Sequence, residues 1–87
     1  MRRKGVSQDQ TDFAEFYAES RDDCLRTVFA TVRDVDHAQD LVAEAFARAW
    51  ASWRRVRSHP APRAWVIRTA LNLSVSSWRR QSSRDSA

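Results

Sequence analysis

The chain has 87 residues, 43% of them hydrophobic and 30% charged, which suffices for one small folded domain and is too apolar for intrinsic disorder. One glycine and two prolines are too few for the turns of an all-β domain, so we expect a helical fold. The single cysteine excludes an intramolecular disulfide and a cysteine-based zinc site. We see neither a secretory signal nor an apolar run of the roughly 20 residues that span a membrane, and we therefore expect a cytoplasmic protein with no membrane association.

The formal net charge of +4 is distributed unevenly along the chain. Residues 12–47 hold nine acids and three bases, whereas residues 48–87 hold nine bases and one acid. A chain divided in this way can present an acidic face to one partner and a basic face to another. The basic segment also contains tryptophans, and this combination indicates nucleic acid, because arginines attract phosphates and aromatic rings stack on bases.

The first two helices are predicted from apolar residues that recur at three- and four-residue spacing. Residues 1–11 are polar and aperiodic, and we interpret them as a disordered arm. A first helix follows over about 12–32, with Thr11 or Asp12 as its cap. After a short polar break, a second helix extends over about 36–54, with a cap at Asp34 or Asp36.

The remainder of the chain predicts an irregular segment, a third helix and a tail. Residues 54–62 contain Pro60 and Pro62, each of which disfavours helix at the residue before it. A last helix is predicted from about residue 62 to residue 80. Residues 81–87 are rich in serine and look like the start of a linker or tail.

Apolar stripes on these helices predict the core. The second helix carries its stripe on Ala38, Leu41, Val42, Ala45, Phe46, Ala49, Trp50 and Trp53. The last helix carries Ala64, Ile67, Leu71, Ser74, Val75 and Trp78. Core packing is therefore the expected role of Trp50, Trp53 and Trp78, whereas Trp65 lies off the main stripe of its helix.

Three stretches resemble region 2 of the extracytoplasmic-function (ECF) group of bacterial sigma factors. They are DFAEFY at residues 12–17, DHAQDLVAEAFARAW at 36–50, and PRAWVIRTALNL at 62–73 followed by WRR at 78–80. The second is similar to the family signature A-E-D-L-V-Q-E-T-F-x-R-x-W, and the third to A-W-L-x-x-I-A-x-N-x-x-x-D-x-x-R-R. The order and spacing also match. Departures occur at Gln39, Ala43 and Ser76, where the family usually has Glu, Gln and Asp.

The resemblance implies an all-α bundle of three to four helices over residues 12–80, monomeric when free. It implies docking on the β′ clamp helices of the RNA polymerase core, and recognition and melting of the promoter −10 element, whose non-template strand is bound as single-stranded DNA. Sigma factors of this group have a further DNA-binding domain, region 4, and nothing in this chain matches it. The chain is accordingly interpreted as a fragment or an unusual single-domain protein.

An acidic patch on the second helix is the predicted polymerase-binding surface. Asp40 and Glu44 are four residues apart and project together, so they can pair with arginines on a partner helix. The full set implied by the resemblance is Gln39, Asp40, Ala43, Glu44 and Arg48. From spacing alone a solvated helix face is the more usual interpretation of such charges, and the resemblance is what favours docking. An anti-sigma factor is the other partner that we expect to cover this patch.

The predicted DNA-binding side chains are basic, polar or aromatic: Arg54, Arg55, Arg57, Ser58, His59, Arg63, Trp65, Arg68, Asn72 and Arg79. Guanidinium groups pair with phosphates in a forked geometry. Residues 58–62 correspond to the family's specificity loop, which holds a −10 base flipped out of the stack. Trp65 is either a stacking wedge or part of the core. Asn72 either reads a base edge or is a buried structural amide.

We expect no enzymatic activity, no cofactor and no metal site. The two histidines, His37 and His59, have no neighbouring cysteine or paired carboxylate with which to form a catalytic or metal site. Besides the sigma-factor interpretation, two alternatives stay open. One is a protein-interaction module whose main role is to be the target of an anti-sigma factor. The other is a generic basic helical domain that binds duplex and single-stranded nucleic acid alike.

Overall fold

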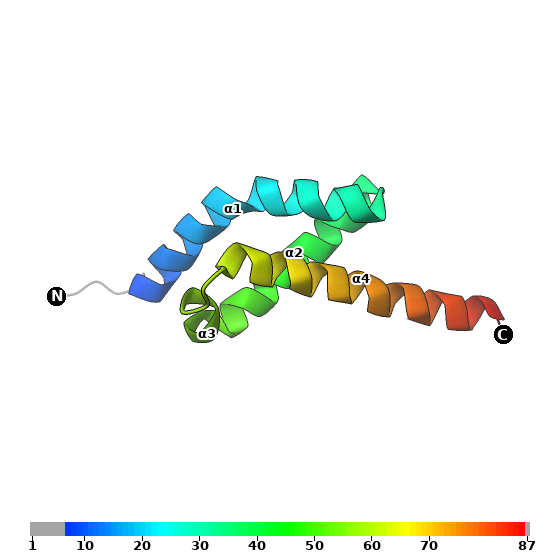
Figure 1. The fold of residues 1–87 in the computed structure, drawn as a ribbon. Coiled ribbons are helices and arrows are strands. Elements are labelled where there is room, and N and C mark those ends of the chain that lie inside the picture. Colours follow the sequence, from blue (N-terminus) through cyan, green and yellow to red (C-terminus); the bar gives the residue numbers. More distant parts are fainter. Residues whose placement is uncertain (1–6, 87) are drawn as a thin grey trace.

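The computed structural model describes the backbone of residues 7–86 and the side chains of residues 7–76. Four helices make up this part of the chain: α1 (Gln8–Val32), α2 (Val35–Ala51), α3 (Trp53–Arg57) and α4 (Pro62–Ser86). The predicted all-α bundle of three to four helices is confirmed. Helix α2 crosses between α1 and α4 and packs against both, and α3 is a short helix at the end of α2 (Figure 1). No described helix is long and apolar enough to cross a membrane.

Helix α1 begins earlier than predicted because a capping box starts it. The Ser7 side chain accepts a hydrogen bond from the Gln10 backbone N–H at 3.1 Å, and the Gln10 side chain accepts one from the Ser7 N–H at 2.9 Å. Residues 8–11 are thus helical, and the predictions of a disordered arm over them and of a cap at Thr11 or Asp12 were wrong. The rest of that arm, residues 1–6, lies outside the described residues.

The connection from α1 to α2 uses two local signals. Arg33 adopts a left-handed conformation (φ 60°) and its N–H closes the end of α1 on the Phe29 carbonyl at 2.8 Å. The Asp34 side chain then accepts from the His37 N–H at 3.0 Å and caps α2, in agreement with the prediction of a cap at Asp34 or Asp36.

The segment after α2 is more regular than predicted. Helix α2 ends at Ala51, and a new short helix begins at once, because Trp53 and Val56 turn into the core and hold the chain in a helical turn. Residues 54–57, predicted as irregular, are therefore helical. Helix α4 starts at Pro62 as predicted, but its backbone continues to Ser86 through residues 81–86, which were predicted as linker. Neither proline nor glycine follows Pro62, so nothing in the local sequence stops this helix.

The core is centred on α2. Six of its hydrophobic residues are buried, together with two each from α1, α3 and α4; the set is Cys24, Val28, Ala38, Leu41, Val42, Ala45, Phe46, Ala49, Trp53, Val56, Val66 and Ala70. Four of the twelve are alanines, which allow the helix backbones to approach closely. Burial raises the pKa of the Cys24 thiol to about 11, so this side chain stays protonated at neutral pH and packs as a small apolar group.

Three of the predicted core residues are exposed instead. On α4, Ala64 and Val75 are exposed, and Val66 and Ala70 take their place in the core. Apolar residues occur on several sides of this helix, so periodicity alone did not select the buried side. On α2, Trp50 is 42% exposed, whereas Trp53, the first residue of α3, is 7% exposed and buried as predicted. The side chain of Trp78 lies outside the described residues.

Candidate protein- and nucleic-acid-binding surfaces

The five residues predicted to bind polymerase all lie on the side of α2 that faces away from its buried stripe. Gln39, Asp40, Ala43, Glu44 and Arg48 are all exposed, and together we call them the acidic α2 face. Arg48 Nε donates to Glu44 Oε2 at 3.2 Å, and both side chains are 55% exposed. A pair this exposed contributes little to stability. Asp40 forms no ion pair with any described residue, so its carboxylate is accessible to a partner.

A hollow between α1 and α2 adjoins this face. It measures about 310 Å³ and is lined by Tyr17, Arg21, Leu25, Gln39, Asp40, Val42 and Ala43. Leu25 and Val42 supply apolar surface, and Asp40 and Arg21 supply one charge of each sign. The short side chain of Ala43, which departs from the family pattern, leaves this space open. Sequence analysis missed Tyr17 and Arg21, because only the packing of α1 on α2 brings them to this surface.

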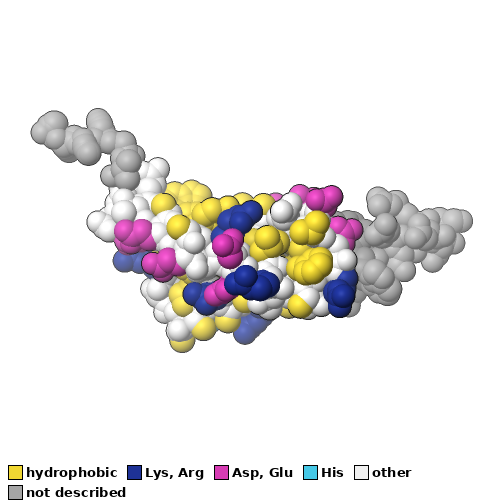
Figure 2. Space-filling view, turned by 90° about the horizontal axis from the view of Figure 1, so that it is seen from above, with side chains coloured by type: hydrophobic (Ala, Val, Ile, Leu, Met, Phe, Trp, Pro, Cys, Tyr) yellow, Lys and Arg dark blue, Asp and Glu magenta, His cyan; other side chains and the backbone are white. Residues whose placement is uncertain are grey.

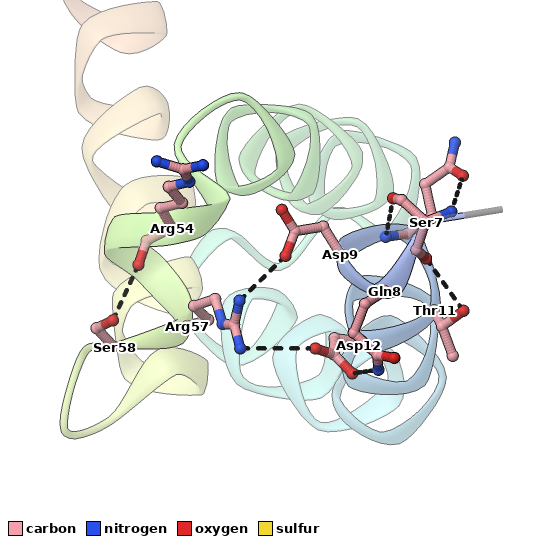
Figure 3. A network of polar contacts seen from close by, with 9 residues as sticks. Ser7, Gln8, Asp9, Thr11, Asp12, Arg54, Arg57 and Ser58 are labelled. Atoms are coloured by element: carbon pink, nitrogen blue, oxygen red, sulfur yellow. Dashed lines mark hydrogen bonds and ion pairs between the residues drawn. The ribbon is translucent and has the colours of Figure 1, made fainter.

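Two predicted DNA-binding arginines are bound within the protein instead. Arg57 Nη1 lies 3.1 Å from Asp9 Oδ1, and Arg57 Nη2 lies 3.7 Å from Asp12 Oδ2, so the guanidinium bridges two carboxylates of α1 (Figure 3). Arg63 Nη1 lies 2.8 Å from Asp23 Oδ2, also on α1. Viewed from the α1 side, acidic and basic side chains accordingly lie next to one another on the molecular surface (Figure 2).

The remaining predicted arginines on α3 and α4 are differently placed. Arg54, Arg55 and Arg68 are exposed, and none of them forms an ion pair with a side chain that the structure describes. Their guanidinium groups are available to phosphates. The side chain of Arg79 lies outside the described residues, and its predicted role stays a prediction.

The segment predicted as a specificity loop, residues 58–62, is tied to its surroundings. Ser58 Oγ donates to the Arg54 carbonyl at 3.0 Å, and the Ala61 N–H donates to His59 Nδ1 at 2.9 Å (Figure 3 shows the first of these). His59 is only partly exposed, since its ring closes the turn. Arg57 precedes this loop and Arg63 follows it, so the ion pairs to α1 anchor the loop at both ends.

Helix α4 continues this surface. Trp65, Arg68 and Asn72 are spaced by three and four residues and therefore share one side of the helix. Asn72 is exposed, which rules out the alternative of a buried structural amide. Trp65 is partly buried and packs against the core, and the residue stays partly accessible to solvent. Its two predicted roles are thus compatible with each other.

Comparisons with known proteins address the family directly. The family model for Sigma-70 region 2 matches residues 16–84 of this chain. Searches of curated proteins and of solved structures gave no match. Sigma region 2 domains are parts of transcription initiation factors and not enzymes, and they serve in RNA polymerase binding and promoter recognition. With a match over most of its length and a four-helix bundle to accompany it, the chain belongs to the Sigma-70 region 2 family.

Proposed function

We propose that this domain is the region 2 of an ECF-type sigma factor, which docks on the β′ clamp helices and holds the melted −10 element as single-stranded DNA. The observation that carries this proposal is the separation of two accessible charged surfaces. Asp40 and Glu44 are exposed on α2, and Arg54, Arg55 and Arg68 are exposed on α3 and α4. One domain can therefore bind a basic protein surface and a polyanion at the same time.

Docking uses the acidic α2 face together with its neighbouring hollow. An arginine of the clamp helices pairs with Asp40, and an apolar side chain beside it enters the hollow of about 310 Å³ between α1 and α2. Ala43 cannot make the polar contact of the family's usual glutamine, but its short side chain leaves room for the apolar side chain of the partner. Burial of the apolar surface then compensates for the missing hydrogen bond.

DNA binding uses the exposed side chains of α3 and α4 and the 58–62 loop. Arg54, Arg55 and Arg68 contact phosphates of the non-template strand, and the amide of Asn72 reads a base edge. The accessible part of Trp65 supports the last stacked base at the edge of the melted region. Arg57 and Arg63 contribute indirectly, since their ion pairs to α1 hold the loop in place.

The two functions are tested with two double variants, each measured on both partners. Asp40→Ala with Glu44→Ala is expected to weaken binding to an isolated β′ clamp-helix fragment by about 2 kcal/mol or more, because a clamp arginine that docking buries against Asp40 loses its carboxylate partner. DNA affinity is expected to stay nearly unchanged. Arg68→Ala with Asn72→Ala is expected to do the reverse, and to lower the preference for −10 single strands over scrambled ones. Trp65 is a poorer probe, because its replacement also removes core packing.

Glu15→Ala with Glu19→Ala is the matched control for the docking variant. These two exposed acids are also four residues apart but lie on α1, so the change in net charge is identical. Equal effects of the two acidic variants would contradict docking through α2. A folded wild type that binds no clamp fragment would assign the acidic α2 face to another partner, such as an anti-sigma factor. Equal affinity for −10, scrambled and duplex DNA would favour a generic nucleic-acid-binding domain.

A further inference from the structure

Trp50, at the end of α2, stands at the surface and is supported from within. Its ring centroid lies 5.3 Å from that of Phe13 on α1, and the Phe13 ring in turn packs edge-on against the buried Trp53 at 5.2 Å. Despite this support, 42% of Trp50 is exposed. A large aromatic side chain held by a rigid cluster yet open to water is well suited to stacking on a ligand.

Surface hollows adjoin this ring. One, of about 730 Å³, is lined by Asp9, Trp50, Ala51, Ser52, Trp53, Arg54 and Arg55. The other, of about 270 Å³, is lined by Gln10, Phe13 and Trp50. Trp50 is common to both, so a planar group has room beside its ring.

The charges around the larger hollow favour an anion. Arg54 and Arg55 are exposed and form no ion pair with described residues, whereas Asp9 is bound by Arg57 at 3.1 Å (Figure 3). The one carboxylate of the lining is thereby offset, and two guanidinium groups remain for a phosphate. At the smaller hollow, Gln10 uses its Oε1 for the α1 cap, which leaves its amide N–H groups to donate to a base edge.

We propose that Trp50, Arg54 and Arg55 form an additional nucleotide subsite, in which Trp50 stacks on a base of the single-stranded DNA and the two arginines hold its phosphate. The inference rests on the proposed function and extends it beyond the 58–62 loop and α4. Because every base has a π-face, this subsite takes a nucleotide of any sequence and contributes affinity without specificity.

The position of the hollow next to the loop supports this assignment. Ser58 is the first residue of the loop, and its Oγ is hydrogen-bonded to the Arg54 carbonyl at 3.0 Å. Arg54 thus precedes the loop by one helical turn, a rise of about 6 Å along the axis of α3. A strand with one base at the loop can therefore bring a neighbouring nucleotide to Trp50. The two guanidinium groups of Arg54 and Arg55 favour a nucleotide in this hollow over an apolar side chain of a protein partner.

The test compares short and extended oligonucleotides on the whole chain. Fluorescence anisotropy measures binding of a labelled −10 element alone and of the same element with a few mixed-sequence nucleotides added at its 5′ or 3′ end. We expect one of the two extensions to bind more tightly to the wild type. Trp50→Ala should lower that affinity by roughly 5- to 150-fold, the range for loss of one stacked base, and leave affinity for the short element unchanged.

Controls separate stacking from folding. Trp50→Phe keeps an aromatic ring against Phe13 and should retain most of the affinity for the extended strand. Phe29→Ala removes another aromatic side chain of similar exposure, 39%, from the far end of α1. This variant should bind both oligonucleotides with the affinity of the wild type. A photoreactive pyrimidine placed along the extension should crosslink to the peptide that contains Trp50, a readout that requires no variant.

The outcomes distinguish this inference from the proposed function. If the short −10 element binds but neither extension is sensitive to Trp50→Ala or crosslinks to Trp50, the subsite is refuted and the proposed function stands. If a folded wild type binds no oligonucleotide, both fail. If Trp50→Ala weakens only binding of the β′ clamp fragment, the hollow is a protein contact and the nucleotide subsite is refuted.

Discussion

The acidic face of α2 and the basic surface of α3 and α4 hold their charges in different ways. On α2, Asp40 has no ion-pair partner among the described side chains, and Glu44 pairs only within its own helix, with Arg48. On the basic surface, Arg57 and Arg63 pair with α1 acids that are 48 and 40 residues away. The comparison shows that the net charge of a chain segment does not give the accessible charge of the surface that this segment forms. The fold leaves the α2 acids accessible, whereas it commits two of the arginines to internal ion pairs.

The ion pairs of Arg57 and Arg63 affect the geometry of the 58–62 loop more than the stability of the domain. The side chains of the Arg57 and Arg63 pairs are 30% to 50% exposed, and pairs of this kind contribute at most about 1 kcal/mol. Both pairs nevertheless connect α1 to the two ends of the 58–62 loop. Their main effect is therefore to position the loop, while Arg54, Arg55 and Arg68 supply the accessible positive charge.

The largest expected effect concerns Cys24, which lies near the Asp23–Arg63 pair. Burial raises the pKa of its thiol from 9.0 to about 11, with Arg63 lowering it and Asp23 raising it by smaller amounts. The folded state thus holds a proton that the unfolded state loses above pH 9.0, so stability should fall as the pH rises from 9.0 towards 11, by on the order of 2 kcal/mol. Urea unfolding of the wild type and of Cys24→Ala across this range measures the effect.

Variants of the ion pair sharpen this measurement. Arg63→Gln should raise the pKa of Cys24 further, and Asp23→Asn should lower it, because the two charges act on the thiol in opposite directions. If the free energy of unfolding falls with alkaline pH just as steeply in Cys24→Ala as in the wild type, the thiol is not buried as described. An unchanged pKa of Cys24 in both ion-pair variants would show that neither charge lies close to the thiol in solution.

An intermediate effect is expected when the accessible Arg68 and the ion-paired Arg57 are compared for their contributions to DNA affinity. Arg68→Gln should weaken binding of single-stranded −10 DNA by about 1 kcal/mol and reduce the salt slope of log K by about 0.7, the value for one phosphate contact with a single strand. Arg57→Gln should leave the slope unchanged, because its guanidinium is already neutralised by Asp9 and Asp12. Titrations at several salt concentrations decide the matter. If Arg68→Gln and Arg57→Gln reduce the salt slope equally, DNA displaces the α1 carboxylates from Arg57.

The smallest effect is expected at Asp23. Asp23→Asn releases Arg63, so affinity for any single strand should rise by less than about 1 kcal/mol, while the preference for the −10 sequence falls because one end of the loop is no longer anchored. Asp22→Asn is the matched control, since this neighbouring acid is 81% exposed, pairs only with Arg21 among the described residues, and carries the same charge. Equal consequences of the two substitutions would argue against anchoring of the loop by Asp23.

The buried stripe of α2 was predictable to a large extent, and that of α4 was not. The predicted set from Ala38 to Ala49 is buried throughout, because this helix has a single apolar stripe with polar residues around it. On α4 the apolar residues Trp65, Val66 and Ile67 are consecutive, so more than one side could have faced the core. Packing against α1 and α2 selected Val66 and Ala70.

The amino-acid sequence by itself determined the helical class, a helix cap at Asp34 or Asp36, the positions of the acidic α2 face and the exposed arginines, and the resemblance that the family match bears out. These features depend on residue spacing and helix capping, both of which are set by residues close together in the chain. Only the tertiary structure decided that Trp50 stands at the surface, that a hollow opens beside Asp40, and that α1 carboxylates hold Arg57 and Arg63. Each of these depends on which helix faces which, and that choice is made by packing between segments far apart in the chain.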